Sequence, residues 1–239
     1  MIYKPRYHKH LKKKLLRDTT GIKITMDDTP LDQVKSTTFL GVIINDNLTW
    51  EDHKQLIYNK ICKTLGLLYK CKKVMTENEC IKMYKTFVEP YFFYGIEVWG
   101  HTIRSENDIL VKLQSKIIRI IFGCARTQDA WNHCNDRINS VTTIYNNVIK
   151  KLCMKHHFGM LPLYFSNFVM PDFNIDQLQN KISRISLDKM YDYKKSPNLL
   201  ETNLKSNCIN KWNALSLDLK TLPYSNSKDA LYKILKKFH

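Results

Sequence analysis

The sequence predicts an α+β fold that is mainly α: a small antiparallel β element, then a helical bundle, then a helical C-terminal segment. Three observations lead to this prediction. Residues 22–26 alternate between apolar and polar side chains, as a half-buried strand does, and residues 38–44 form an apolar run that contains one glycine. From Thr49 onwards, apolar residues recur every three to four positions, which is the period of a helix with one buried face. The chain has 239 residues, enough to bury a substantial core.

We expect three segments along the chain. Residues 1–50 contain the strands, residues 51–160 the helical bundle, and residues 161–239 a mixture of short helices and irregular structure. Within the first segment, the strands are predicted at 3–7, 22–26 and 38–44. Asp27-Asp28-Thr29-Pro30 has the composition of a turn.

Two helices are predicted after residue 48, and each begins with a capping signal. Thr49-Trp50-Glu51-Asp52 and Thr76-Glu77-Asn78-Glu79 both place a hydroxyl three residues before an acid, as in a capping box. Pro90 ends the second of these helices. The side chains that we expect to be buried are Ile57, Ile61, Leu65 and Leu68 in the first helix, and Ile81, Tyr84, Phe87 and Val88 in the second.

Pro90 also suits the first turn of a third helix, which is rich in aromatic residues. This helix is apolar nearly all round, so we expect it in the middle of the bundle. Its rings are able to stack on nucleic-acid bases, but packing in the core is the interpretation that we favour. The rings are those of Tyr91, Phe92, Tyr94 and Trp99.

A further helix follows the cap Ser105-Glu106-Asn107-Asp108 and ends at Gly123, a natural C-terminal stop. Beyond it, helices are predicted at about 142–157, 209–217 and 227–238. The expected buried residues are Leu110, Leu113, Ile117, Ile120 and Ile121 in the first of these four helices, and Ile144, Val148 and Leu152 in the second.

The chain is strongly basic. It has 38 Lys and Arg residues against 22 Asp and Glu residues, a formal charge of +16. Positive surface follows from such a surplus, and nucleic acid is the commonest partner for it. Solubility alone, or an anionic membrane surface, remains an alternative reading of the same charge.

Five cations lie opposite the apolar stripes of two predicted helices. A row of cations on the free face of a helix suits contact with a phosphate backbone, and it is equally typical of a solvated face. The dependence of binding on salt separates the two, because each neutralised phosphate steepens the log–log salt slope by about 0.9. These candidate nucleic-acid-binding residues are Lys63, Lys70, Lys112, Lys116 and Arg119.

Several classes of protein are not indicated. No apolar run approaches the roughly 20 residues of a membrane span, and the N-terminus lacks the apolar stretch of a secretory signal. Seven scattered cysteines favour reduced thiols, and therefore an intracellular location, nuclear or cytoplasmic. The groups Cys124, His133, Cys134 and Cys153, His156, His157 contain zinc-binding residue types, but their spacings fit no common zinc template, so we predict no metal site.

No catalytic motif is present that would support chemistry or small-molecule binding by this chain alone. The sequence contains no Gly-x-Ser-x-Gly elbow, no phosphate-binding glycine loop and no His-Glu-x-x-His.

An ordered series of motifs does resemble a known family. Phe39-Leu40-Gly41-Val42 is followed by Leu48, Trp50 and His53, then by 84–91, and later by Lys211-Trp212-Asn213-Ala214-Leu215. Between them lie Lys60-Ile61, Gly66-Leu67-Leu68-Tyr69, Tyr94-Gly95, Val98-Trp99-Gly100, Leu113-Gln114-Ser115-Lys116 and Ile118-Arg119-Ile120-Ile121. This series is similar to the reverse transcriptases of jockey-like non-LTR retrotransposons. It is dense between 36 and 125 and thinner between 160 and 205.

The resemblance implies that residues 1–50 are the last strands of a polymerase palm and that residues 51–160 are a thumb, which would grip primer–template duplex. It also implies that the catalytic aspartates, the fingers and the rest of the palm lie upstream. No catalytic residue can then be carried onto this chain. The full-length polymerase would use Mg²⁺, whereas we expect no cofactor in this chain.

Met26-Asp27-Asp28 imitates a catalytic acidic pair. It lies about a dozen residues before Phe39-Leu40-Gly41, where the resemblance implies an ordinary turn, and no third carboxylate is placed near it in sequence so as to complete a catalytic site. We therefore predict a structural turn. The alternative to a polymerase fragment is a non-catalytic remnant, or a module that the host has reused for binding nucleic acid or protein.

Overall fold

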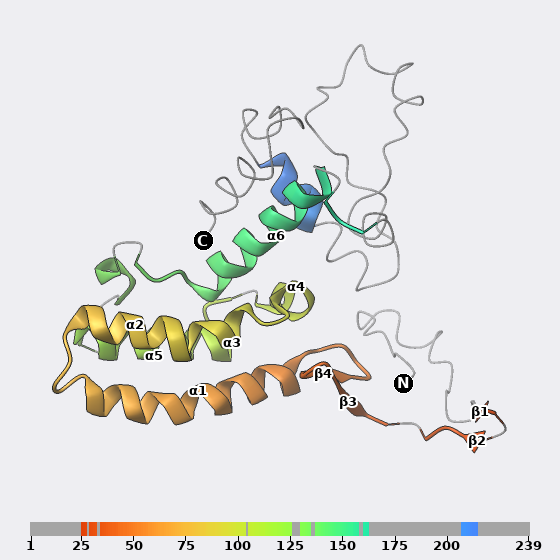
Figure 1. Ribbon diagram of the computed structural model, residues 1–239, viewed down its shortest axis with the longest axis horizontal. Coiled ribbons are helices and arrows are strands. Elements are labelled where there is room, and N and C mark those ends of the chain that lie inside the picture. Colours follow the sequence, from red (N-terminus) through yellow and green to blue (C-terminus); the bar gives the residue numbers. More distant parts are fainter. Residues whose placement is uncertain are drawn as a thin grey trace, which may run out of the picture.

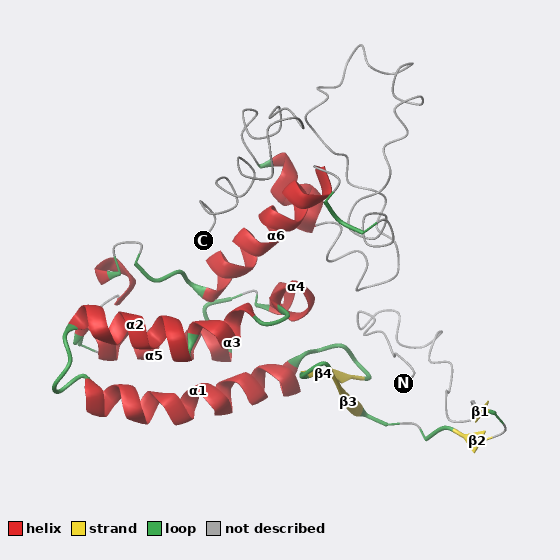
Figure 2. Ribbon diagram, viewed as in Figure 1, coloured by secondary structure: helices red, strands yellow, loops and turns green. Residues whose placement is uncertain are grey.

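The computed structural model describes residues 25–27, 29–32, 34–103, 105–125, 130–134, 137–157, 160–162 and 207–214. Two small hairpins precede a set of packed helices (Figures 1 and 2). The predicted α+β fold, mainly α, is thereby confirmed. The elements are β1 (Thr25–Met26), β2 (Thr29–Pro30), β3 (Ser36–Phe39), β4 (Val42–Asn45), α1 (Glu51–Cys71), α2 (Glu77–Phe87), α3 (Glu89–Phe93), α4 (Ile96–Trp99), the 3₁₀ turn η3 (Gly100–Thr102), α5 (Ile109–Phe122), the 3₁₀ turn η4 (Ala130–His133), α6 (Val141–His157) and a helix at 207–213.

The single strand predicted at 38–44 is wrong, because the chain reverses in its middle. β3 and β4 pair antiparallel, from Ser36 opposite Asn45 to Phe39 opposite Val42. The two residues between them both have positive φ, 47° at Leu40 and 77° at Gly41, which is the backbone of a tight two-residue hairpin turn. Glycine at the second turn position makes this conformation accessible. The predicted strand at 3–7 lies outside the described residues.

The capping box predicted at Thr49 is also wrong. The residue that precedes α1 is Trp50, which has a left-handed backbone (φ 61°) and makes no capping hydrogen bond through its side chain. The Thr49 amide instead donates to the side chain of Asn45. A left-handed non-glycine residue costs roughly 1–2 kcal/mol. Burial of the Trp50 ring, which is only 2% exposed, offsets that cost, because burying a large apolar side chain contributes about 1.5–3 kcal/mol.

The helix that begins at Glu77 has the predicted capping box. The Thr76 hydroxyl accepts a hydrogen bond from the Glu79 amide, and the Glu79 carboxylate accepts one from the Thr76 amide. Cys80, Ile81 and Tyr84 are buried, whereas Phe87 is 51% exposed, so its predicted burial is wrong. Position 87 falls beside the buried face rather than on it.

The aromatic helix expected from Pro90 to Trp99 is interrupted. Tyr94 and Gly95 form a turn between α3 and α4, and Gly95 has a positive φ of 63°. Phe92 and Trp99 are buried as predicted. Tyr91 and Tyr94 are 36% and 57% exposed, so for these two residues the prediction of core packing is wrong.

The next helix, α5, has its cap at Asp108 rather than at Ser105, since the Asp108 carboxylate accepts a hydrogen bond from the Leu110 amide. The helix ends at Gly123 with the predicted left-handed backbone (φ 67°). Its buried face is wider than the predicted stripe, because Gln114 and Ile118 are buried as well, while Ile120 is only partly buried.

Gln114 ties α5 to the segment before α6. Its amide nitrogen donates to the Tyr84 hydroxyl (2.7 Å) and to the Asn139 carbonyl (2.8 Å), and its amide oxygen accepts from the Val141 amide (2.9 Å). The desolvated amide is therefore fully used, which explains how a polar side chain is tolerated in the core.

The last described helices pack on each other. In α6, Ile144 is buried as predicted, but Val148 and Leu152 are only partly so, and Ile149 and Cys153 are buried in addition. α6 contacts α3, α4 and the helix 207–213 (Figure 1). Trp212 of the Lys211–Leu215 motif is 4% exposed and belongs to the core. The predicted helix at 227–238 lies outside the described residues.

Candidate nucleic-acid interface

The first pair of candidate cations lies on the outer face of α1. Lys63 and Lys70 are exposed, and the residues that α1 buries, such as Ile57 and Ile61, lie on its opposite side. Seven residues, or about 10 Å of helix, separate the two lysines. Within the part of the chain that the structure describes, neither of them takes part in an ion pair.

The second group lies on the outer face of α5, which contains three cations and no acidic residue. Lys112 and Lys116 are exposed one turn apart, about 6 Å along the helix, which is close to two phosphate steps of 3.4 Å on one nucleic-acid strand. Arg119 differs from them because it is only partly exposed. Its Nε is buried without a hydrogen-bond partner among the described residues.

The structure does not bring the five cations into one surface. Helices α1 and α5 pack against each other through their buried faces, and α2 packs against both. The faces that carry the lysines are opposite to these contacts, so they point in different directions. There are therefore two candidate surfaces: the α1 face, made of Lys63 and Lys70, and the α5 face, made of Lys112 and Lys116 with Arg119 at its edge.

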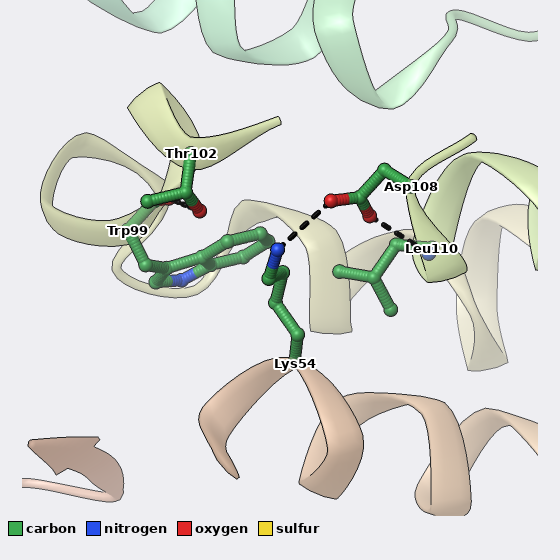
Figure 3. Close-up of polar contacts among 5 residues, drawn as sticks. All are labelled: Lys54, Trp99, Thr102, Asp108 and Leu110. Atoms are coloured by element: carbon green, nitrogen blue, oxygen red, sulfur yellow. Dashed lines mark hydrogen bonds and ion pairs between the residues drawn. The ribbon is translucent and has the colours of Figure 1, made fainter. Parts of the chain in front are cut away.

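Two further lysines of α1 hold helices together, and the helical period of the sequence did not predict these roles. The Lys60 ammonium lies 5.8 Å from the centre of the Tyr91 ring, a cation–π contact that joins α1 to α3. The Lys54 Nζ forms an ion pair of 2.9 Å with Asp108 at the start of α5 (Figure 3). Both side chains of this pair are nearly buried, so Lys54 positions the two helices and is not free to bind phosphate.

His53, one of the motif residues, connects the β3–β4 hairpin to α1. It is 2% exposed, and its Nδ1 accepts a hydrogen bond of 3.3 Å from the Ile43 amide. The ring lies edge-on to Trp99, with 5.7 Å between the ring centroids. Burial, assisted by the positive charge of Lys60, lowers the pKa of His53. The neutral ring is therefore the form that accepts from the strand.

Asp27 lies in the turn between β1 and β2 with φ 48°, as predicted, and Asp28 lies outside the described residues. No three His, Cys, Asp or Glu side chains of the described ranges come together as a group that could hold a metal ion. The described residues therefore contain no carboxylate set that fits the Mg²⁺ implied for a full-length polymerase. None of the seven cysteines, all of which lie in the described ranges, forms a disulfide.

The class of protein that this chain resembles is the RNA-directed DNA polymerase of mobile elements, and the resemblance stated from the motifs is confirmed by three relatives. The chain is 29% identical over 143 residues to the RNA-directed DNA polymerase from mobile element jockey of Drosophila funebris. These residues are 57% of this chain and 15% of that protein. It is 26% identical over 113 residues to the probable RNA-directed DNA polymerase from transposon X-element of Drosophila melanogaster, covering 46% of this chain and 12% of the relative.

A third relative, the probable RNA-directed DNA polymerase from transposon BS of Drosophila melanogaster, is 28% identical over 105 residues, which are 42% of this chain and 12% of that protein. The matched stretch thus spans between 12% and 15% of the length of these relatives. No protein-family model and no solved structure matches the chain. Every helix in the described ranges is too short or too polar to cross a bilayer.

Proposed function

We propose that this chain is the palm-end and thumb portion of a retrotransposon RNA-directed DNA polymerase, and that its bundle grips primer–template duplex. The support from the sequence is the likeness to three such polymerases. The observation that carries the gripping role is the α5 face, where two exposed lysines follow one another at a spacing close to two phosphate steps, on a helix without acids. The contact is to the backbone, so the grip recognises shape and charge rather than sequence.

The α1 face is a second contact in the same proposal. Because it points away from the α5 face, one straight duplex cannot lie along both. We propose that the α5 face holds the duplex and that Lys63 and Lys70 meet another part of the nucleic acid. In this proposal the catalytic carboxylates and their Mg²⁺ belong to a part of the parent polymerase outside this chain, and nucleotide addition requires that part.

The test measures the affinity of the full chain for a primer–template duplex across a series of salt concentrations. The variant Lys112→Glu/Lys116→Glu should flatten the log–log salt slope by about 1.8, because each lost phosphate contact removes about 0.9. Arg119 stays unchanged because it is partly buried. Lys35→Glu/Lys82→Glu changes the net charge equally at two exposed lysines outside both faces and should retain more of the slope.

Equal slopes for the two double variants would contradict the gripping role of the α5 face, since net charge alone would then account for binding. Lys63→Glu/Lys70→Glu, measured in parallel, reports the α1 face separately. If the chain does not bind duplex at all, that result would favour the alternative that it is a non-catalytic remnant. Primer extension by this chain alone would contradict the proposed location of the carboxylates.

A further inference from the structure

A shallow pocket of about 440 Å³ lies beside the β3–β4 hairpin, and the lysines of the two candidate surfaces are not among its lining residues. Its walls come from α2, α3, the turn after α3, and α4, which follow one another along the chain (Figure 1). Its lining includes two aromatic rings and three charged side chains. The residues that matter for the argument are Lys85, Glu89, Pro90, Phe93, Tyr94 and Glu97.

The Tyr94 ring is fixed at the surface. Its hydroxyl donates a hydrogen bond to the Leu40 carbonyl in the hairpin turn, and its ring edge lies against Gly41, where a Cβ would be 3.6 Å from the nearest ring carbon. The side chain is nevertheless 57% exposed. A tyrosine that served the core would be buried, whereas an exposed ring held in one orientation is pre-organised for stacking on a planar partner.

The charged groups of the pocket have complementary uses. The exposed Lys85 is a donor suited to a phosphate, while the carboxylates of Glu89 and Glu97 accept hydrogen bonds from amino groups, such as those on the edges of cytosine and adenine. Burial raises the pKa of Glu89, and the charge of Lys85 opposes that change. In the described part of the chain, none of these three groups takes part in an ion pair.

This combination selects among possible occupants. An apolar protein segment seated on the rings would cover three charged groups without pairing them, which costs free energy. A nucleotide offers a ring for Tyr94, amino groups for the carboxylates and a phosphate for the lysine. The chain's charge of +16 brings nucleic acid to its surface in any case.

We propose that the pocket binds one unpaired base of a single-stranded nucleic acid, stacked on Tyr94, with Lys85 at a neighbouring phosphate and Glu89 and Glu97 at the amino group of the base. The proposal rests on the proposed function and deepens it. The single-stranded extension of a primer–template has a site of its own, separate from the duplex contacts on α5.

The experiment compares the affinity of the full chain for a blunt duplex and for the same duplex with a short single-stranded extension, made as DNA and as RNA. The extension should tighten binding, and Tyr94→Ala should remove that gain, a loss of about fivefold to a hundredfold for one stacked base. Binding of the blunt duplex should be unchanged. Tyr94→Phe keeps the ring but loses the hydrogen bond to Leu40, so it should keep part of the gain, and Tyr69→Ala removes a similarly exposed tyrosine on α1 as the matched control.

The wild-type protein supplies a measurement that does not depend on how a variant folds. An extension that carries 5-iodocytosine, which keeps the amino group, should crosslink on irradiation to the pocket, at Phe93 or Tyr94. An extension of cytosines should bind more tightly than one of thymines, which lack the amino group.

The two proposals fail in different ways. Absence of blunt-duplex binding would reject the duplex grip. If the duplex binds but Tyr94→Ala leaves the gain from the extension intact, or weakens the blunt duplex equally, the pocket proposal is overturned alone. Crosslinks confined to residues outside 85–97, or a loss in Tyr94→Phe as large as in Tyr94→Ala, would also overturn it. So would a Tyr94→Ala effect limited to self-association of the chain, which would identify a second copy as the occupant.

Discussion

Removing the carboxylate of Asp108 should lower the free energy of unfolding by about 4–6 kcal/mol, because one side chain has two roles. It caps α5 by accepting from the Leu110 amide at 2.9 Å, and loss of such a cap costs about 1 kcal/mol. It also pairs with Lys54 at 2.9 Å, with the two side chains 7% and 11% exposed (Figure 3). Leaving one member of a buried pair alone costs about 3–5 kcal/mol.

Equilibrium urea unfolding, followed by circular dichroism, measures this loss in Asp108→Ala. Asp108→Asn retains a capping oxygen and loses only the charge, so it should be less destabilising than Asp108→Ala by about the 1 kcal/mol of the cap. Lys54→Met alone should also be strongly destabilising. The double variant Lys54→Met/Asp108→Asn should be more stable than the sum of its single changes requires, since no unpaired charge remains.

Additive changes of less than about 1 kcal/mol in each single variant would refute this reasoning. The pair would then be solvated in solution, and apolar packing alone would fix α1 against α5.

Four further changes should also alter stability. Gly100→Ala should destabilise the fold by at least about 1–3 kcal/mol, because its Cβ would lie 2.5 Å from a ring carbon of Tyr145. Gly66→Ala, at an exposed position of α1 with nothing within 4 Å of the new Cβ, should instead stabilise the fold by about 0.5–1 kcal/mol. Melting temperatures that shift in the same direction for both variants would be inconsistent with the packing. Burial and the charge of Lys60 hold the pKa of His53 below its ordinary value of 6.5, so the unfolded chain takes up the proton first as the pH falls. The free energy of unfolding should therefore fall as the pH drops from about 6.5 towards the pKa of the folded state. His53→Gln should remove that part of the pH dependence. An unchanged profile in His53→Gln would show that other groups cause it. Gln114→Leu should cost at least about 2 kcal/mol in urea unfolding, because it leaves buried hydrogen-bond partners unsatisfied, and a neutral result would mean that water replaces the amide.

Local signals in the sequence predicted the helices well where the controlling contacts lie within a few residues. The capping box at Thr76 and the left-handed stop at Gly123 need only neighbouring atoms, so they could be read directly. The failure at Thr49 has a distant cause: burial of the Trp50 ring in the core sets the backbone at the start of α1 and overrides the local preference. The break at Tyr94 and Gly95 has the same character, since the preferred geometry there includes a hydrogen bond to the hairpin.

For the candidate interface, too, the sequence predicted some features and not others. Periodicity correctly put Lys63, Lys70, Lys112 and Lys116 on exposed faces, because the opposite side of each helix is apolar. It could not show that the two faces diverge, since the direction of a face depends on how α1 and α5 pack. It also gave Arg119 the same status as the lysines, although its Nε is buried.

The sequence by itself determined that this chain is basic, that it forms helices with one apolar face after a small β element, and that its motifs resemble those of jockey-like polymerases. Only the tertiary structure decided which charges are buried and which rings remain at the surface. Lys54 is paired with Asp108, and Tyr94 is held by Leu40, and in both cases the partner lies 54 positions away. Such contacts form only when distant segments pack together, and no pattern within a single helix specifies them.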